Sequence, residues 1–249
     1  MACFVIYSMS KKVLVGCPTY SGQEYCLDRF LAGLDAISYD SVEVVFVDNS
    51  DDDMYLKRLK DIKMAGKKIT VLKDAISDTR ISRIISSRNR VRDHFLKGDY
   101  SHLLFLDTDI IAPCDVIERL LALDTDVASG VYLGRVVIDG KLHLIPILYR
   151  HHDGGRVRTV TMTEAMNDDI FDISVCGLGC CLVRKTVVEK IRFRRFGNTS
   201  DSGEDTAFCL DVQGNGFEIK ADTSVKCAHM GKNEVLVFPK KSKTTVTFG

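Results

Sequence analysis

The chain of 249 residues has no tryptophan, only four prolines and no net charge, because 34 basic residues balance 34 acidic ones. Without a net positive field, nothing in the composition favours nucleic acid as the main partner. No apolar run approaches the length of a transmembrane helix, and Met1–Tyr7 lacks the basic region and cleavage site of a signal peptide. The sequence is therefore that of an ordinary globular protein, and its functional site must be sought among local groups of charged residues.

Cysteine usage excludes two further kinds of site. The nine cysteines are an odd number without a CxxC pair, so neither a zinc site nor a disulfide framework is indicated. We therefore expect the protein to work in the reducing environment of the cytoplasm. A peripheral position at a membrane is also compatible with the sequence. The strand-like segment Lys12–Cys17 follows Met9 so closely that Met9 is a candidate for the natural start, with Met1–Ser8 as a dispensable extension.

The first part of the chain alternates strand and helix patterns. Ser21 and Glu24 match a capping box, and the continuous apolar run Leu103–Leu106 is typical of a parallel strand covered on both faces. Such an order predicts an α/β fold with a mostly parallel central sheet flanked by helices. The expected elements are strands at Val13–Val15, Val42–Val47, Ile69–Leu72 and Leu103–Leu106, and helices from Ser21 through Leu34, at Met54–Met64 and at Thr79–Leu96.

After Ile110 the pattern changes to a smaller mixed or antiparallel β part. Asp139-Gly140 is a hairpin turn signal, and His151-His152 precedes a glycine-rich turn that could touch a second substrate. The expected elements are strands at Val131–Val137, Lys141–Tyr149, Val157–Met162, Phe217–Ala221 and Val225–Ala228, and a helix from Glu204 that ends before Gly214-Asn215-Gly216. Because no linker or repeat interrupts the chain, we predict one domain over residues 1–249.

Asp107 and Asp109 follow the buried strand Leu103–Leu106, and ligands of open α/β sheets collect beyond the carboxyl ends of strands. Two residues apart in an extended chain, both carboxylates point the same way. They repel each other unless a hard cation such as Mg²⁺ or Mn²⁺ is shared with phosphate oxygens. The alternative is that one aspartate caps the following turn, but the buried strand before the pair favours the cation site.

Asp48 and Asn49 follow Val44–Val47 in the same way. A carboxylate at this edge can accept a hydrogen bond from the imide N–H of uracil or from a ribose hydroxyl, and we select Asp48 alone. The alternative, an acidic turn and helix start, is the better account of Asp51–Asp53.

Arg88 lies on the apolar stripe of the helix predicted at Thr79–Leu96, one heptad after Ile81. A guanidinium on an inner face is costly without a partner, so we expect it to pair with Asp48, Asp107 or a phosphate. The alternative is an arginine at the margin of the stripe with its charge in water. Solvated charges are expected at Arg80, Arg83, Arg90 and Arg92.

Two later residues extend the candidate set. Asp205 falls at the third position of a capping box begun by Ser202, where the helix N-terminus keeps a carboxylate ionised and ready to accept a proton. His229 returns late in the chain, and its imidazole is a credible third ligand beside Asp107 and Asp109. A lone histidine is more often structural, so this role depends on the aspartate pair.

Taken together, these stretches resemble the inverting glycosyltransferases of family 2 and their GT-A relatives over Val13–His229. Asp48-Asn49-Ser50 replaces the commoner Asp-Asp-Gly-Ser, and the Gln-x-x-Arg-Trp motif of processive synthases is missing, so single-sugar transfer is expected. The segments that carry the resemblance are Val15–Tyr20, Val45–Ser50, Ser87–Asn89, Lys97–Tyr100 with Leu106–Asp109, Gly177–Arg184, Gly203–Asp205 and His229.

The resemblance implies a GT-A, Rossmann-like domain with a nucleotide-binding half at 11–109, an acceptor and catalytic half at 110–236 and a tail at 237–249. It implies a nucleotide-diphosphate sugar as donor and a glycan, lipid-linked or protein acceptor. The implied roles are base and ribose contacts from Pro18, Thr19, Tyr20 and Asp48, a metal-bridged diphosphate at Asp107 and Asp109 near Arg88, a metal- or diphosphate-contacting His229, substrate contacts from Gly179 and Glu204, and a catalytic base at Asp205. Closure of Gly197–Gly203 would then exclude water.

Two other functions stay open. A sugar-1-phosphate nucleotidyltransferase uses a similar sheet and metal, but it needs a glycine-rich basic loop where this chain has Cys17–Gly22. A non-catalytic nucleotide-sugar or glycan-binding module would not need a base and a metal site together. The presence of Asp107, Asp109, Asp205 and His229 therefore favours the enzyme.

Overall fold

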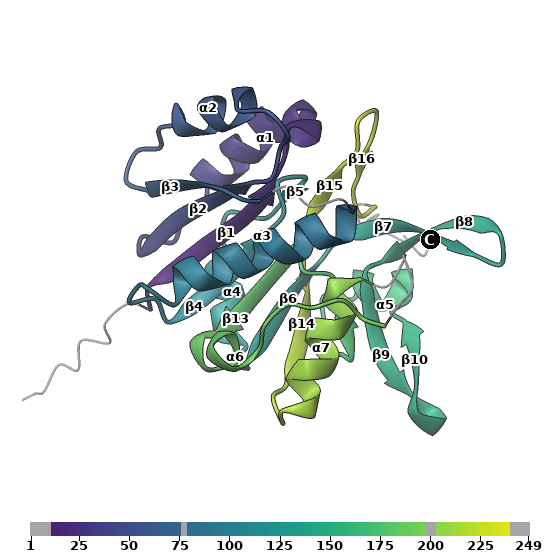
Figure 1. The fold of residues 1–249 in the computed structure, drawn as a ribbon. Coiled ribbons are helices and arrows are strands. Elements are labelled where there is room, and N and C mark those ends of the chain that lie inside the picture. Colours follow the sequence, from purple (N-terminus) through teal and green to yellow (C-terminus); the bar gives the residue numbers. More distant parts are fainter. Residues whose placement is uncertain (1–10, 76–78, 198–202, 240–249) are drawn as a thin grey trace, which may run out of the picture.

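The computed structural model describes residues 11–75, 79–197 and 203–239 (Figure 1). Its centre is an eight-stranded sheet in which β4, β1, β2 and β3 are parallel neighbours, whereas β13 runs antiparallel to β4 and β6. The predicted α/β class with a mostly parallel central sheet is confirmed. In spatial order the strands are β11 (Ile170–Asp172), β14 (Ile219–Lys226), β6 (Val127–Val131), β13 (Cys180–Arg184), β4 (His102–Leu106), β1 (Val13–Thr19), β2 (Val42–Asp48) and β3 (Lys68–Lys73).

Helices cover both faces of this sheet because its strands are apolar on both sides. In β1, Val13 and Val15 face the cluster that α1, α2 and α4 complete, whereas Leu14 faces the cluster that α3, α6 and α7 complete. None of the helices in the described part of the chain has the length and apolar character to cross a membrane. The helices are α1 (Glu24–Asp35), α2 (Met54–Lys60), α3 (Arg80–Phe95), α4 (Val116–Ala122), α5 (Met162–Met166), α6 (Lys185–Lys190) and α7 (Glu204–Gly214).

The predicted smaller β part consists of three short sheets in the second half of the chain. Two hairpins, β7–β8 and β9–β10, project from the body of the molecule (Figure 1), and His151 and His152 end β9. The strands are β7 (Leu133–Ile138) with β8 (Lys141–Pro146), β9 (Leu148–His152) with β10 (Arg156–Thr159) and β12 (Val175–Cys176), and β15 (Ala228–Met230) with β5 (Ile110–Ile111) and β16 (Val235–Leu236).

Two helix starts differ from the prediction. A 3-10 turn at Ser21–Gln23 precedes α1, and the Ser21 N–H donates to Ser50 Oγ at 2.7 Å, so the capping box predicted there is wrong. An unpredicted capping box forms at Thr161, whose hydroxyl accepts from the Glu164 N–H at 3.2 Å. It starts α5 at the end of the predicted strand Val157–Met162, whose first part is the strand β10 (Arg156–Thr159).

Strand boundaries in the second half also shift. The predicted strand Val131–Val137 breaks at Tyr132, whose carbonyl oxygen accepts from Ile147 N–H at 3.0 Å, and this break lets β7–β8 leave the sheet. The two strands expected between Phe217 and Ala228 are largely one strand, β14, with an irregular register after Ala221. Residues 198–202 of the predicted closing segment and residues 1–10 with the candidate start lie outside the described residues.

Candidate active site

A cavity of about 500 Å³ opens beyond the carboxyl ends of β1, β2 and β4. Parallel pairing brings these ends together, since Thr19 of β1 is in register with Asp48 of β2. The predicted residues Pro18, Thr19, Tyr20, Arg88, Asp107 and Asp109 line the cavity, together with Gly22, Gln23, Tyr25, Asn49, Arg80, Arg83, Ile84 and Lys232, which were not selected from the sequence. The residues expected to contact the nucleotide therefore line the same cavity as the aspartate pair.

Arg88 connects the aspartate pair to α7. Its side chain is almost fully buried, and it donates from Nε to Glu204 Oε1 at 2.9 Å and from Nη2 to Asp107 Oδ2 at 3.2 Å. The remaining guanidinium nitrogen, Nη1, is buried without a hydrogen-bond partner among the described residues. The pairing of Arg88 with Asp107 agrees with one of its expected partners, and Nη1 keeps N–H donors that no described residue uses.

Burial and neighbouring charges shift the pKa values of Arg88 and Asp107. Burial opposes the charge on Arg88, but Asp107 and Glu204 outweigh it and raise the Arg88 pKa above its usual value. Burial raises the pKa of Asp107, and Asp109 and Glu204 add to the rise against the opposing charge of Arg88. Asp107 is therefore a carboxylate that lacks full compensation and would gain from a cation.

Asp109 and His229 form the second pair of the site. The Nδ1 of His229 lies 2.8 Å from the carbonyl oxygen of Leu133, which only accepts, so Nδ1 carries the hydrogen. Nε2 then faces Asp109 Oδ2 at 3.7 Å, and the Asp109 carboxylate raises the His229 pKa. When the imidazole is neutral, an Nε2 lone pair and a carboxylate face each other, as two ligands of a divalent cation would.

The donor chemistry of these residues fits a divalent cation. Asp107 and Asp109 offer the hard oxygens that Mg²⁺ and Mn²⁺ prefer, and His229 offers one imidazole nitrogen of fixed tautomer. In this conformation Asp107 is turned to Arg88, and no three His, Cys, Asp or Glu side chains of the described residues gather into a metal site. The three-ligand set predicted from the sequence therefore stays a prediction.

Asp205 lies in the first turn of α7, directly after Glu204. Burial raises its pKa to about 6, with Glu204 adding to the rise, and its Oδ1 accepts from the Thr206 N–H at 2.7 Å. Gly203 is the N-cap and provides no side-chain cap, while Ser202 of the predicted capping box lies outside the described residues. A carboxylate with this pKa is ionised at neutral pH and basic enough to accept a proton.

Neutral side chains hold the turn after β1 beneath the cavity. Thr108, fully buried between the two aspartates, donates to Gln23 Oε1 at 2.7 Å and lies 3.1 Å from Thr19 Oγ1. Thr19 Oγ1 also lies 2.8 Å from Tyr55 Oη. Tyr20, which follows, is 46% exposed and lines the cavity, so its ring is available for stacking.

Asp48 and Asn49 face different ways. Asp48 is fully buried and does not line the cavity, because Oδ1 accepts from Ser50 N–H and Oγ while Oδ2 accepts from Lys73 Nζ at 3.0 Å. Asn49 lines the cavity instead. Its Nδ2 donates to Ser87 Oγ at 2.9 Å, which fixes the amide and leaves Oδ1 as an acceptor. The structure thus gives a substrate no open surface on Asp48, contrary to the expected direct contact.

Several basic residues also differ from their predicted place. Arg92 was expected to be solvated, but its guanidinium donates to the carbonyl oxygens of Val188, Ile191 and Glu189, so this prediction is wrong. Arg83, which lines the cavity, pairs with Asp51 at 2.9 Å. Side-chain direction on a helix depends on its neighbours in space, and the sequence pattern alone did not supply them.

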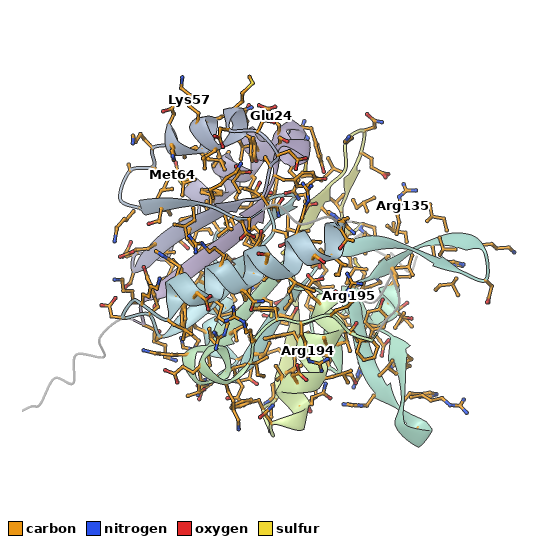
Figure 2. All side chains as sticks on the ribbon, viewed as in Figure 1. Glu24, Lys57, Met64, Arg135, Arg194 and Arg195 are labelled. Atoms are coloured by element: carbon orange, nitrogen blue, oxygen red, sulfur yellow. The ribbon has the colours of Figure 1, made fainter. Side chains whose placement is uncertain are left out.

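Arg195 adds a further cation near the start of α3. Figure 2 shows it with Arg194 on the side of the molecule where α3 and α7 lie, and its Nη2 is 3.4 Å from Thr79 Oγ1. Lys232, which lines the cavity, follows His229 closely in the chain. The position of Lys232 just after the late histidine was the signal that could have pointed to it.

The remaining predicted residues join the site away from the cavity lining. Gly179 accepts a hydrogen bond from the Asp107 N–H at 3.1 Å, and Glu204 holds Arg88. The structure therefore brings together Arg88, Asp107, Asp109, Gly179, Glu204 and His229 through direct contacts or the shared cavity, with Asp205 adjoining Glu204.

A mostly parallel sheet with helices on both faces and a carboxylate pair at the end of β4 is the architecture of a GT-A fold of the α/β class. The chain belongs to glycosyl transferase family 2, whose family model matches residues 15–192, and it is a glycosyltransferase. A comparison with curated proteins found no match.

The solved structures that share the fold include two that we compare with this chain. The crystal structure of GalNAc-T7 with UDP, GalNAc and Mn²⁺ has a TM-score of 0.64 and 14% identity, covering 89% of this chain and 44% of that one. The crystal structure of A197 from STIV has a TM-score of 0.51 and 16% identity, covering 96% of this chain and 100% of that one. The chain thus spans less than half of GalNAc-T7, and at these identities the likeness concerns the fold alone.

Proposed function

We propose that this glycosyltransferase moves one sugar from a nucleoside-diphosphate sugar to an acceptor hydroxyl, with a divalent cation and with inversion at the anomeric carbon. The observation that carries the proposal is the buried path from Asp107 through Arg88 to Glu204, the neighbour of Asp205. It links a carboxylate of the cavity to a partly buried carboxylate with a pKa of about 6. The groups proposed to bind the diphosphate, Asp107 and Arg88, are thus connected to the neighbour of the proposed proton acceptor, Asp205.

The cavity suits a nucleoside diphosphate. Arg80, Arg83, Arg88 and Lys232 line it, and the buried Nη1 of Arg88 offers two N–H donors. Tyr20 offers a ring to a base, and Asn49 Oδ1 offers an acceptor to an N–H of that base. These groups support a nucleotide with an N–H on its recognition edge, such as a uridine nucleotide.

Asp107, Asp109 and His229 are the residues that would hold the cation. When bound there, a divalent cation would neutralise negative charge that develops on the leaving diphosphate. The GalNAc-T7 structure contains Mn²⁺ and UDP, which makes these the first probes for this chain. Arg88, freed from Asp107 when that carboxylate turns to a cation, would direct its donors to the same phosphate group.

Asp205 provides the proton acceptor. Its raised pKa lets the ionised carboxylate take the proton of an acceptor hydroxyl as that oxygen attacks the anomeric carbon. Attack from the face opposite the diphosphate breaks the bond to the leaving oxygen and inverts the configuration. Glu204 and Arg88 hold the start of α7 against the donor site, so the base keeps its place relative to the diphosphate.

The proposal can be tested with a panel of UDP- and GDP-sugars and Mn²⁺, by following nucleotide release without an added acceptor. We expect at least one donor to be hydrolysed by the wild-type protein only when Mn²⁺ is present. Asp109→Ala should lower the rate by at least a hundredfold, whereas Asp115→Ala, at an exposed aspartate of the same segment, should not.

Full activity of Asp109→Ala in excess EDTA would remove the metal from the model. Calorimetry with Mn²⁺ and UDP separates the remaining alternative, a binding module: tight binding with no nucleotide release from any donor of the panel would favour that function instead.

A further inference from the structure

Tyr132, the single residue between β6 and β7, contacts the candidate site although it belongs to no motif of the sequence. Its ring packs edge-on against the imidazole of His229, with centroids 5.6 Å apart and planes at 81°. The next residue, Leu133, accepts the Nδ1–H of His229 at 2.8 Å. Two consecutive residues thus fix this imidazole, one through its ring and one through its hydrogen bond.

The hydroxyl of Tyr132 lies among the residues around Gly179. The Gly179 N–H donates to Tyr132 Oη at 3.4 Å, and the Gly179 carbonyl oxygen accepts from the Asp107 N–H at 3.1 Å. A Cβ on Gly177 would lie 1.9 Å from Tyr132 Oη, although Gly177 does not have a positive φ. Gly177 is therefore needed for space, and the space it leaves is filled by this hydroxyl.

The phenol of Tyr132 carries a hydrogen that it can donate. An ordinary tyrosine keeps its hydrogen at neutral pH, and the charges of both Asp107 and Asp205 reach the hydroxyl of Tyr132. Gly179 N–H occupies one lone pair of Oη, and the phenolic hydrogen meets no acceptor in the part of the chain that the structure describes. The hydroxyl is thus a donor within the fields of both the diphosphate anchor and the proposed base.

A sugar in transfer must extend between these two carboxylates, because its anomeric carbon joins the diphosphate to the attacking hydroxyl. We propose, on the basis of the proposed function, that Tyr132 is a positioning residue for this sugar: its phenolic hydrogen donates to a sugar oxygen, and its ring holds His229. The two parts of the side chain then act on different steps, sugar binding and cation binding.

This separation defines the experiment. Tyr132→Phe keeps the ring and removes the hydroxyl, and Tyr132→Leu removes both. With the donor that the wild-type protein hydrolyses best, we expect Tyr132→Phe to lower kcat/KM about fivefold to tenfold, as the loss of one hydrogen bond predicts, with unchanged Mn²⁺ affinity. Tyr132→Leu should also weaken Mn²⁺ binding, measured by calorimetry with Mn²⁺ alone, about tenfold or more.

Tyr39→Phe is the matched control, because its hydroxyl donates to the Lys11 carbonyl oxygen at the opposite end of the sheet. It should leave both quantities at wild-type values. An active wild-type protein with unchanged kcat/KM in Tyr132→Phe and unchanged Mn²⁺ affinity in Tyr132→Leu would overturn the role of Tyr132 alone. A wild-type protein that neither binds Mn²⁺ nor releases nucleotide from any donor would overturn the proposed function and this inference together.

A second measurement tests the contact itself and does not need turnover. Gly177→Ala should lower Tm more in the wild-type background than in the Tyr132→Phe background. The Cβ of the new alanine would lie 1.9 Å from Tyr132 Oη, and phenylalanine lacks this oxygen. Equal losses in the two backgrounds would contradict the placement of the hydroxyl.

Discussion

The two sides of the candidate site are built in different ways. The nucleotide side consists of turns that directly follow β1, β2 and β4, three parallel neighbours whose register aligns their ends. The catalytic side collects Tyr132, Gly179, Asp205 and His229 from separate segments of the second half. Local sequence thus specifies the first side, whereas only the packing of the whole chain assembles the second.

The two sides also differ in what holds them. Neutral hydrogen bonds among Thr19, Thr108 and Gln23 support the nucleotide side. Its ion pair of Asp48 with Lys73 includes a partly exposed lysine. Ionised groups with shifted pKa values, Arg88 among them, hold the catalytic side in a buried setting. Losing one ionised partner leaves a charge uncompensated, so single substitutions on the catalytic side should have the larger effects.

The largest effect is expected at Asp205. Asp205→Asn keeps the shape of the side chain but cannot accept the proton, so transfer to an acceptor should fall about 10²- to 10⁴-fold. Asp211→Asn, on the same helix and paired with Arg194 at 2.7 Å, is the control for the loss of a carboxylate. Retention of a tenth or more of the transfer rate by Asp205→Asn would assign the base elsewhere.

Asp205 should also make the rate and the stability respond to pH in opposite directions. As the base ionises with a pKa of about 6, kcat/KM should fall as the pH drops below about 6. The folded carboxyl has a higher pKa than an unfolded one, so its contribution to stability decreases as pH rises through the window from about 4 to 6. Urea unfolding at pH 7 should therefore show Asp205→Asn no less stable than wild type.

A smaller but broader effect is expected at Arg88, which joins the two sides. Arg88→Met leaves Glu204 and Asp107 without their buried partner and should cost about 3–5 kcal/mol of unfolding free energy. Arg90→Met, at an exposed arginine of the same helix, should change it by less than about 0.5 kcal/mol. Similar urea midpoints for the two variants would contradict the buried ion pairs.

The same contrast explains what the sequence could predict. The order of strands and helices before Asp109 follows from apolar runs and turn signals, and the structure has that order. Tyr132 could not be predicted, because the glycines that make room for its hydroxyl are distant in sequence and show no local pattern. Arg92 was misplaced for the same reason, since the carbonyl groups that bind it lie in and just after α6.

Asp48 and Asn49 show a finer limit. The sequence indicated that polar groups at the end of β2 face the ligand, but it did not decide which of two consecutive residues does so. Side chains alternate along a strand, and a turn begins just where the alternation would have decided. In the structure Lys73 and Ser50 bind the buried Asp48, and Asn49 lines the cavity.

The smallest effects are therefore expected at these two residues, and they should separate binding from stability. Asp48→Asn would set an amide against Lys73 and should cost about 1–3 kcal/mol of unfolding free energy with an unchanged KM for the donor. Asn49→Ala removes the acceptor Oδ1 and should raise that KM about threefold to tenfold with unchanged kcat. The opposite outcome, a raised KM and full stability in Asp48→Asn, would return base recognition to the aspartate that the sequence favoured. It would also mean that the turn after β2 rearranges when the donor binds, and then the nucleotide side would be no more fixed by local sequence than the catalytic side.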